Sequence, residues 1–227
     1  MGCGKLSLLK VVAAFFFLMP WLSGPAWGAV GCELNDPDRD VARLFPASTG
    51  YKTVALEIQK VGGQKLLAKV EAKLRDKLHG LYESIDVPYT MYVIYAHKKK
   101  IGYIHGVTQK GRYGGINIFI VLDIEERIKT FYIQKMSGAY AGKFREAEFG
   151  KQFAGLTLED FEQYDVITGK GTGKVAGIKN PAPEATHDFK YILRGTKKNM
   201  ILANEFLRMA PELSAQNGAP PKGAALP

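Results

Sequence analysis

The sequence predicts one α+β domain in which an antiparallel meander of strands is covered by helices. Runs rich in Tyr, Ile, Val and Phe follow one another with only short breaks, as in a meander; they occupy residues 89–97, 101–108, 116–124 and 128–136. Helical patterns lie before and after these runs, and no internal repeat or long linker divides the chain. We therefore place a single domain over residues 33–210.

Residues 1–31 have the features of an export signal. Lys5 and Lys10 give a positive start, Val11 to Leu22 form an almost wholly apolar run, and small residues follow. That run is shorter than the roughly 20 apolar residues of a membrane-spanning helix, which favours a cleaved signal over an uncleaved anchor. We therefore expect a periplasmic protein, or one anchored on the outer side of the cytoplasmic membrane.

Two cleavage sites fit this signal. Ala29-Val30-Gly31-Cys32 resembles a bacterial lipobox, whose Cys is acylated, although the lipobox prefers Leu where Ala29 stands. Ala26-Trp27-Gly28 has small residues three and one positions before the cut and would release a soluble protein. A lipid anchor at Cys32 and a soluble form are therefore alternatives. Cys3 lies in the signal, so the mature chain cannot form an intramolecular disulfide.

The segment before the meander predicts two helices. Asp36-Pro37 predicts the start of a short helix that is capped by Asp36 and ends near Phe45-Pro46. Residues 51–59 are expected to be extended or mixed. Apolar residues at three- and four-residue spacing predict an amphipathic helix over residues 63–79, which Gly80 ends.

The segment after the meander predicts three helices and a long loop. Helices are expected over residues 143–153, 156–161 (with Thr157 as its cap) and 184–209. The Gly- and Pro-rich stretch 165–183 predicts a loop around one brief strand at Val175–Ile178. Residues 211–227, rich in Pro and Ala, predict a disordered tail.

Composition and motif searches exclude several functions. The net charge is +9, which suits nucleic acid, anionic lipid, an acidic partner or a phosphate-bearing cofactor, but export argues against nucleic acid. The four histidines form no pair at metal-ligand spacing, and no Cys-x-x-Cys-His haem site is present. Gly-x-Ser-x-Gly, Walker and His-Glu-x-x-His patterns are also missing, so nothing indicates a hydrolase.

The most informative segment is Gly111-Arg112-Tyr113-Gly114-Gly115, between two predicted strands, because glycines permit positive φ and close approach of another group. Gly102-Tyr103 precedes it, and the loop Met136–Gly142 follows the next strand. Phe149, then Gln152-Phe153 with Gly155, come afterwards. This order of landmarks, over about residues 90–207, resembles the FMN-binding domain of Nqr- and Rnf-type electron-transfer complexes.

The resemblance implies FMN as the cofactor and suggests its attachment point. In that family a late Ser/Thr-Gly-Ala-Thr motif, usually preceded by Asp, carries FMN as a phosphoester on its Thr, installed by a flavin transferase. The best match is Asn180-Pro181-Ala182-Pro183-Glu184-Ala185-Thr186, in which Ala185-Thr186 fit. Asn180 replaces the Asp, Pro183 the Ser/Thr and Glu184 the Gly, and a carboxylate repels phosphate. The start of the predicted last helix favours phosphate. Covalent FMN, non-covalent FMN and loss of the flavin all stay open.

The resemblance also places the following residues beside the FMN: Gly114, Gly115, Ser137, Gly138, Ala139 and Tyr140. By position, Tyr113, Tyr140 and Phe189 could stack on the flavin ring, and Lys135 or Lys143 could place positive charge near it.

An electron-transfer flavoprotein that works with membrane or periplasmic redox proteins is therefore the expected function. The alternative is a non-redox accessory or ligand-binding protein that kept the fold and lost the flavin. A flavin reductase is the third option, and no nicotinamide-site pattern supports it.

Overall fold

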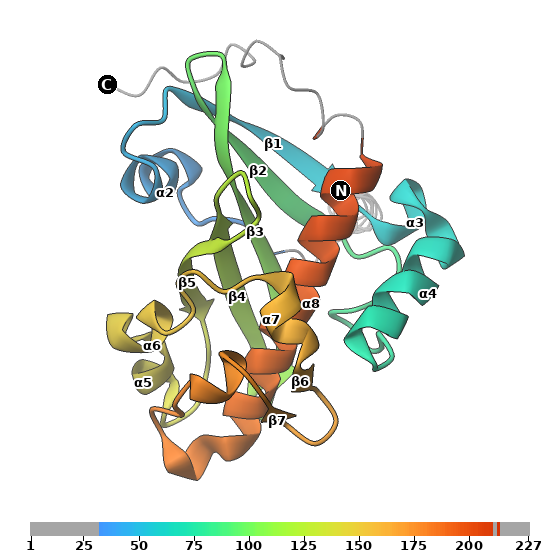
Figure 1. Ribbon diagram of the computed structural model, residues 1–227, viewed down its shortest axis with the longest axis vertical. Coiled ribbons are helices and arrows are strands. Elements are labelled where there is room, and N and C mark those ends of the chain that lie inside the picture. The colour runs from blue at the N-terminus through green and yellow to red at the C-terminus, as the bar shows by residue number, and fades with distance from the viewer. Residues whose placement is uncertain (1–31, 211–212, 214–227) are drawn as a thin grey trace, which may run out of the picture.

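The computed structural model describes residues 32–210 and residue 213. The predicted signal (1–31) and the predicted tail (211–227), apart from Leu213, lie outside the described residues. Within the described part, five strands form an antiparallel sheet in the order β1-β2-β3-β4-β5, with helices on its two faces (Figure 1). This confirms the predicted α+β class and the meander.

Each of the four predicted runs forms a strand of this sheet. The strands are β1 (Gly50–Leu56), β2 (Tyr89–Ala96), β3 (Lys99–Gly111), β4 (Gly114–Leu122) and β5 (Ile128–Lys135). β1 pairs with β2, so most of the segment predicted to be extended or mixed is a strand. Gly111 pairs with Gly114, so Arg112 and Tyr113 form a two-residue turn. Gly114 has φ +125°, a conformation that favours glycine and explains the glycines of this turn.

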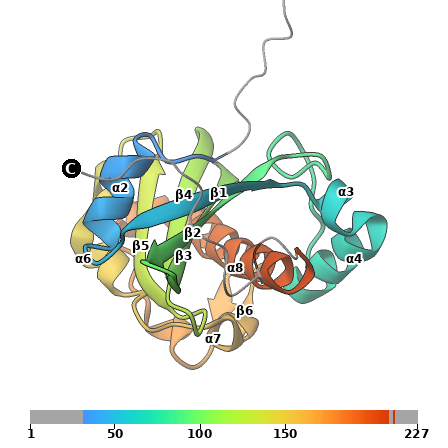
Figure 2. The ribbon, with the colours of Figure 1, turned by 90° about the horizontal axis from the view of Figure 1, so that it is seen from above.

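One face of the sheet is covered by α8 (Thr186–Met209), which crosses β3 and β4 (Figures 1 and 2). Ile116, Ile118 and Ile120 alternate along β4 and belong to the core on this side. α8 is buried continuously from Ile192 to Phe206, because the sheet covers one side of it and α4 (Gly63–Leu74) packs beside it. The short helix α3 (Ile58–Val61) precedes α4 and packs on it. The larger core of the protein therefore lies between the sheet and α8.

The other face is covered by α2 (Pro37–Leu44). Asp36 accepts a hydrogen bond from the backbone N–H of Arg39 at 3.1 Å, which confirms the predicted cap. A second core forms here from Cys32, Leu34, Val41, Phe45, Tyr92, Ile94, Ile104, Phe119 and Val121. Cys32 is 2% exposed, and a Cβ on Gly106 would lie 3.0 Å from its Sγ. The lipid anchor at Cys32 stays a prediction, and it requires the sulfur to leave this contact.

The chain between β5 and α8 forms short elements. They are α5 (Ala141–Arg145), α6 (Ala147–Lys151), α7 (Leu158–Glu162), β6 (Tyr164–Asp165), β7 (Lys170–Gly171) and 3₁₀ turns at Val175–Gly177 and Pro183–Ala185. Thr157 caps α7 in a reciprocal capping box with Asp160, as predicted for Thr157. No described helix is long and apolar enough to cross a bilayer.

Helix α4 ends earlier than predicted, at Leu74 instead of near residue 79. Arg75 takes a left-handed conformation with φ +59°. The Glu71 carboxylate then accepts hydrogen bonds from Lys77 Nζ (2.6 Å) and from the backbone N–H of Leu78 (3.1 Å). These bonds fold the chain after Leu74 back along the helix. The apolar spacing in the sequence therefore continues to Leu78, although the helix itself ends at Leu74.

Three predicted boundaries in the second half were also wrong. The helix expected over residues 143–153 is two helices, because Glu146 is extended (φ −63°, ψ 142°) between them. The strand expected at Val175–Ile178 is a 3₁₀ turn, in which Ile178 N–H bonds to Val175 O at 3.2 Å. The last helix begins at Thr186 because Pro183 starts a 3₁₀ turn before it.

Candidate functional site

Three segments that are distant in sequence meet at one end of the domain. They are the β3–β4 turn, the loop that follows β5, and the first turn of α8. The backbone N–H of Arg112 donates to Asp188 Oδ1 at 2.8 Å, across 76 positions of sequence. The loop after β5 lies on the turn, since a Cβ on Gly138 would stand 2.8 Å from Tyr113 Cδ2. The segments predicted to contact FMN are therefore neighbours in space.

The predicted residues of the turn and the loop lie at or near the surface of this end. Gly114 faces open space, whereas Gly115 has Thr108 and Tyr82 close to its Cα. Ser137, Gly138, Ala139 and Tyr140 are all exposed. Tyr113 is 60% exposed and Tyr140 is 40% exposed.

The predicted attachment residue begins helix α8. Thr186 is exposed, and its hydroxyl donates to the carbonyl oxygen of Pro183 at 2.8 Å. Ala185 is buried, and the exposed Glu184 precedes it in the 3₁₀ turn. The Thr186 hydroxyl is therefore accessible from solvent, with a carboxylate two positions before it.

Two other predicted contributors are directed elsewhere. Phe189 is half-buried, and its ring packs 6.3 Å from the ring of Phe149 in the core. Lys143 pairs with Glu146 at 3.3 Å on the surface. Lys135 is exposed at the end of β5. Of the predicted ring contacts, Tyr113 and Tyr140 therefore have the exposure that stacking requires.

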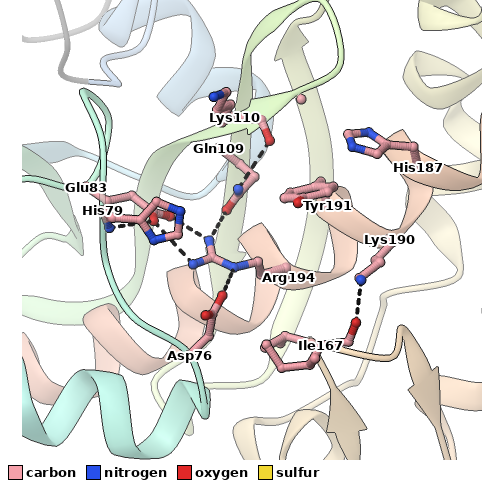
Figure 3. Close-up of a pocket in the computed structure, with 12 residues that line it drawn as sticks. Asp76, His79, Glu83, Gln109, Lys110, Ile167, His187, Lys190, Tyr191 and Arg194 are labelled. Atoms are coloured by element: carbon pink, nitrogen blue, oxygen red, sulfur yellow. Dashed lines mark hydrogen bonds and ion pairs between the residues drawn. The ribbon is translucent and has the colours of Figure 1, made fainter.

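A pocket of about 430 Å³ lies beside this end of the domain, on the side of α8 that faces the linker between α4 and β2 (Figure 3). Its lining residues are Asp76, His79, Glu83, Gln109, Lys110, Gly111, Val166, Ile167, His187, Lys190, Tyr191 and Arg194. None of the eight residues that the sequence placed beside the FMN lines it. The volume falls in the range of small-ligand sites.

The floor of the pocket is a buried ion-pair network centred on Arg194 (Figure 3). The guanidinium donates to Asp76 Oδ2 (2.7 Å), to both carboxylate oxygens of Glu83 (2.6 and 3.2 Å) and to Gln109 Oε1 (2.9 Å). It also donates to the carbonyl oxygen of Lys77 at 3.1 Å. All five N–H donors of the guanidinium are thus occupied by protein acceptors.

Glu83 is the acidic centre of this network. Lys198 Nζ donates to Glu83 Oε1 at 2.6 Å and to the carbonyl oxygen of Thr108 at 2.9 Å. Burial by itself raises the pKa of Glu83, but the charges and hydrogen bonds of Lys198 and Arg194 outweigh it and hold the pKa at about 2. Glu83 is therefore ionised at neutral pH. Together, Asp76, Glu83, Arg194 and Lys198 give the floor no net charge.

The rim of the pocket carries the side chains that can meet a ligand. Lys110 is exposed, and its Nζ forms no ion pair or hydrogen bond within residues 32–210. Lys190 Nζ donates to the carbonyl oxygen of Ile167. The rings of His187 and Tyr191 lie 4.5 Å apart at 31°. The exposed side chain of Ile167 lines the pocket on another side. The rim therefore combines positive charge with an aromatic and apolar wall.

The sequence contained a signal for this pocket that the motif search did not use. His187, Lys190, Tyr191 and Arg194 have the spacing of one helical face within the predicted last helix. A polar stripe of this kind, on a helix otherwise buried, indicates a ligand site or an ion-pair network. The contributions of Glu83 and Gln109 carried no local signal, because they reach the pocket through the tertiary fold.

The hairpin β6–β7 was also missed. Asp165 Oδ1 accepts hydrogen bonds from the backbone N–H groups of Ile167 (2.8 Å) and Thr168 (3.1 Å), and Gly169 has φ +73°. Asp165, Thr168 and Gly169 fit the Asp, Ser/Thr and Gly positions of the flavin-attachment motif better than Asn180, Pro183 and Glu184 do. Lys170 and Gly171 stand where the motif has Ala-Thr, so this hairpin has no Thr at the attachment position.

Among the described residues, no group of three or more His, Cys, Asp or Glu side chains could hold a metal ion. Comparison with models of protein families finds no match for this chain, and comparison with curated proteins finds none either.

Proposed function

We propose that the protein binds FMN at the end of the domain where the β3–β4 turn, the loop after β5 and the start of α8 meet. The observation that carries the proposal is the pair of contacts between Arg112 and Asp188 and between Gly138 and Tyr113. Sequence resemblance selected these segments separately, and the fold supports the selection by bringing them together. In this role the protein transfers electrons between periplasmic or membrane redox partners.

The residues at this end fit a flavin in two respects. Tyr113 and Tyr140 offer exposed aromatic rings for a planar ligand, and Gly138 lets the loop after β5 pack closely on Tyr113, where a Cβ would stand 2.8 Å from Cδ2. Thr186 is the first residue of α8, whose N-terminus has no side-chain cap, and a helix N-terminus favours a phosphate. The chemistry that FMN supplies when bound is electron transfer, while the protein binds and orients it.

Thr186 is the proposed attachment residue for covalent FMN, because its hydroxyl is exposed at the start of a long helix. A flavin transferase is the implied partner for that reaction. The adjacent carboxylate of Glu184 works against a phosphate here, so non-covalent binding is the alternative mode.

A second candidate function is a non-redox accessory protein that has lost the flavin. Pro183 and Glu184 favour it, because they form a 3₁₀ turn where the attachment motif requires a small, flexible residue. The proposal of export is common to both functions, and it rests on residues 1–31. A lipid anchor at Cys32 and a soluble periplasmic form remain its two variants.

The visible spectrum of the exported protein separates these functions. The protein is produced with a flavin transferase, and its spectrum is recorded before and after denaturation. Colour that stays on the denatured chain and is lost in Thr186→Ala, but not in the control Thr168→Ala, identifies covalent FMN. Colour released on denaturation identifies non-covalent FMN. A colourless protein that fails to bind added FMN overturns the flavin proposal and supports the accessory function.

A further inference from the structure

The pocket beside α8 is a ligand site separate from the residues proposed to hold the flavin ring. We propose that it binds a phosphate monoester whose organic part is planar or apolar, with the phosphate attracted by the positive charges of the rim lysines Lys110 and Lys190 and the organic part against Tyr191 and Ile167. This inference does not depend on flavin binding. It depends on the charge, the lining and the shape of the pocket.

The charge of the pocket favours an anion. The two acids of the floor, Asp76 and Glu83, are neutralised by Arg194 and by Lys198 behind it. The positive charges of Lys110 and Lys190 on the rim have no carboxylate partner within residues 32–210. Because the floor is neutral and the rim is cationic, an anionic group gains attraction without displacing an existing ion pair.

The donors on the rim suit a phosphate group. Lysine ammonium groups bind phosphate as point charges and reorient easily on flexible side chains. The ring nitrogens of His79 and His187 add further donors, although His187 Nδ1 also lies 3.7 Å from Asp188 Oδ1 and His79 Nδ1 lies 3.0 Å from the carbonyl oxygen of Lys77. These cations and imidazoles come from different elements, so the tertiary fold assembles them.

The walls of the pocket suit a planar or apolar group attached to the phosphate. The rings of His187 and Tyr191, tilted by 31° to each other, form one wall. Val166 and the exposed side chain of Ile167, in the β6–β7 hairpin, form the other. The volume of about 430 Å³ exceeds that needed by a free phosphate ion, so part of the ligand is expected to be organic.

The floor of the pocket keeps this geometry rigid. Arg194 bonds to Asp76 and Glu83 in the linker after α4 and to Gln109 in β3. It thereby joins the linker to the sheet. All its donors are occupied, so Arg194 positions the walls and is not expected to bind the ligand. Binding therefore falls to the rim residues, which can be substituted without breaking the buried network.

Titration by two-dimensional NMR of the exported, ¹⁵N-labelled protein tests the inference. Phenyl phosphate is expected to shift the backbone amides of residues 109–111 and 187–191 and to bind more tightly than inorganic phosphate or phenol. In the double variant Lys110→Gln/Lys190→Gln its affinity is expected to fall about tenfold, because two favourable charges are lost. The double control Lys60→Gln/Lys151→Gln makes the same charge change on exposed side chains of α3 and α6 and is expected to leave the affinity unchanged.

The same titration shows how the inference fails. Unchanged affinity in the double variant, or shifts confined to amides outside the pocket, would overturn it, and so would equal binding of phenol and phenyl phosphate. Competition of FMN and riboflavin with phenyl phosphate tests whether the phosphate in the pocket is that of FMN. FMN that displaces phenyl phosphate, while riboflavin does not, supports the pocket as the site of the FMN phosphate. FMN that binds without displacing phenyl phosphate supports a second, independent phosphate site.

Discussion

The carboxylate of Asp188 accepts a hydrogen bond from the backbone N–H of Arg112 at 2.8 Å and thereby joins the first turn of α8 to the β3–β4 turn. Asp188 is buried. Gly111 makes it possible, since a Cβ there would lie 2.6 Å from Ile116 Cδ1 and 3.2 Å from Asp188 Oδ1. The proposed flavin site and the pocket both border this bond, so its strength bears on both.

Replacing Asp188 is therefore expected to loosen the β3–β4 turn. Asp188→Ala leaves the N–H of Arg112 without its acceptor, which costs about 1–3 kcal/mol of unfolding free energy. Hydrogen exchange of the amides of residues 111–115 should accelerate. Asp123→Ala is the matched control, because Asp123 accepts backbone hydrogen bonds from Glu125 and Arg127 in the β4–β5 turn. Equal acceleration at residues 111–115 in both variants would contradict the assigned role.

The network of Glu83, Arg194 and Lys198 predicts a large and pH-dependent effect on stability. Glu83→Gln removes the carboxylate that pairs with the buried Lys198 and one of the two that pair with Arg194, and should lower the unfolding free energy by about 3–5 kcal/mol. The control Glu148→Gln removes an exposed ion pair with Lys151 and should change stability by less than about 1 kcal/mol. Denaturant titrations at neutral pH compare the two variants.

The pH dependence of this network has a definite sign. Folding lowers the pKa of Glu83 from 4.5 to about 2, so the folded state binds fewer protons than the unfolded state between these values. The stability that Glu83 contributes is complete above pH 4.5 and is lost as the pH falls towards 2. The stability of Glu83→Gln should therefore change less with pH over this window. Parallel curves for the variant and the parent protein would contradict the assignment.

His105 predicts a second loss of stability on acidification, in a pH window above that of Glu83. Asn199 donates its amide hydrogens to the carbonyl oxygens of His105 (3.3 Å) and Ile118 (3.1 Å), so its oxygen accepts from His105 Nδ1–H at 2.5 Å. His105 Nε2 is then an unprotonated, buried atom. Burial lowers the pKa of His105 from 6.5 to about 4, against the opposing hydrogen bonds of Asn199. The histidine is therefore neutral in the folded protein at pH 7.

Stability should fall as the pH drops from 6.5 to 4, because the unfolded state takes up the proton first. The loss reaches about 3 kcal/mol at about 1.4 kcal/mol per pKa unit. His105→Gln keeps an amide donor and should flatten the curve in this window. His97→Asn changes an exposed histidine, at φ +54° where Asn is tolerated, and should leave the curve unchanged. Thermal unfolding at a series of pH values measures both.

The sequence was sufficient for the elements whose signals are local. The strands follow from β-branched and aromatic runs, and the caps at Asp36 and Thr157 follow from side-chain chemistry at helix starts. The errors arise where a distant contact decides. α4 ends at Leu74, and the Glu71 carboxylate accepts a hydrogen bond from the backbone of Leu78 beyond the helix end. Nothing in the spacing of the apolar residues indicates this contact.

The candidate site likewise has parts with a local sequence signal and parts that depend on distant contacts. The β3–β4 turn is readable from the sequence, because its glycines interrupt two β-type runs and Gly114 takes a positive φ next to the turn. The pocket is not readable in the same way. Its floor joins Glu83 to Arg194 across 111 positions of sequence. The charges on its rim also look like ordinary surface lysines until the fold shows that no carboxylate of residues 32–210 pairs with them.

The flavin proposal makes its sharpest prediction at two glycines of the same loop region. Gly138→Ala adds a Cβ at 2.8 Å from Tyr113 Cδ2, at a residue with φ +118°. The ring of Tyr113 or the loop must then move, so FMN affinity should fall several-fold and stability should fall by about 1 kcal/mol or more. Gly142→Ala is the matched control, because Gly142 lies in α5 with open space around it and alanine favours a helix. Fluorescence titration with FMN compares the two variants. Equal affinities would show that Tyr113 and the loop after β5 do not form the ring site, even if the protein binds flavin elsewhere.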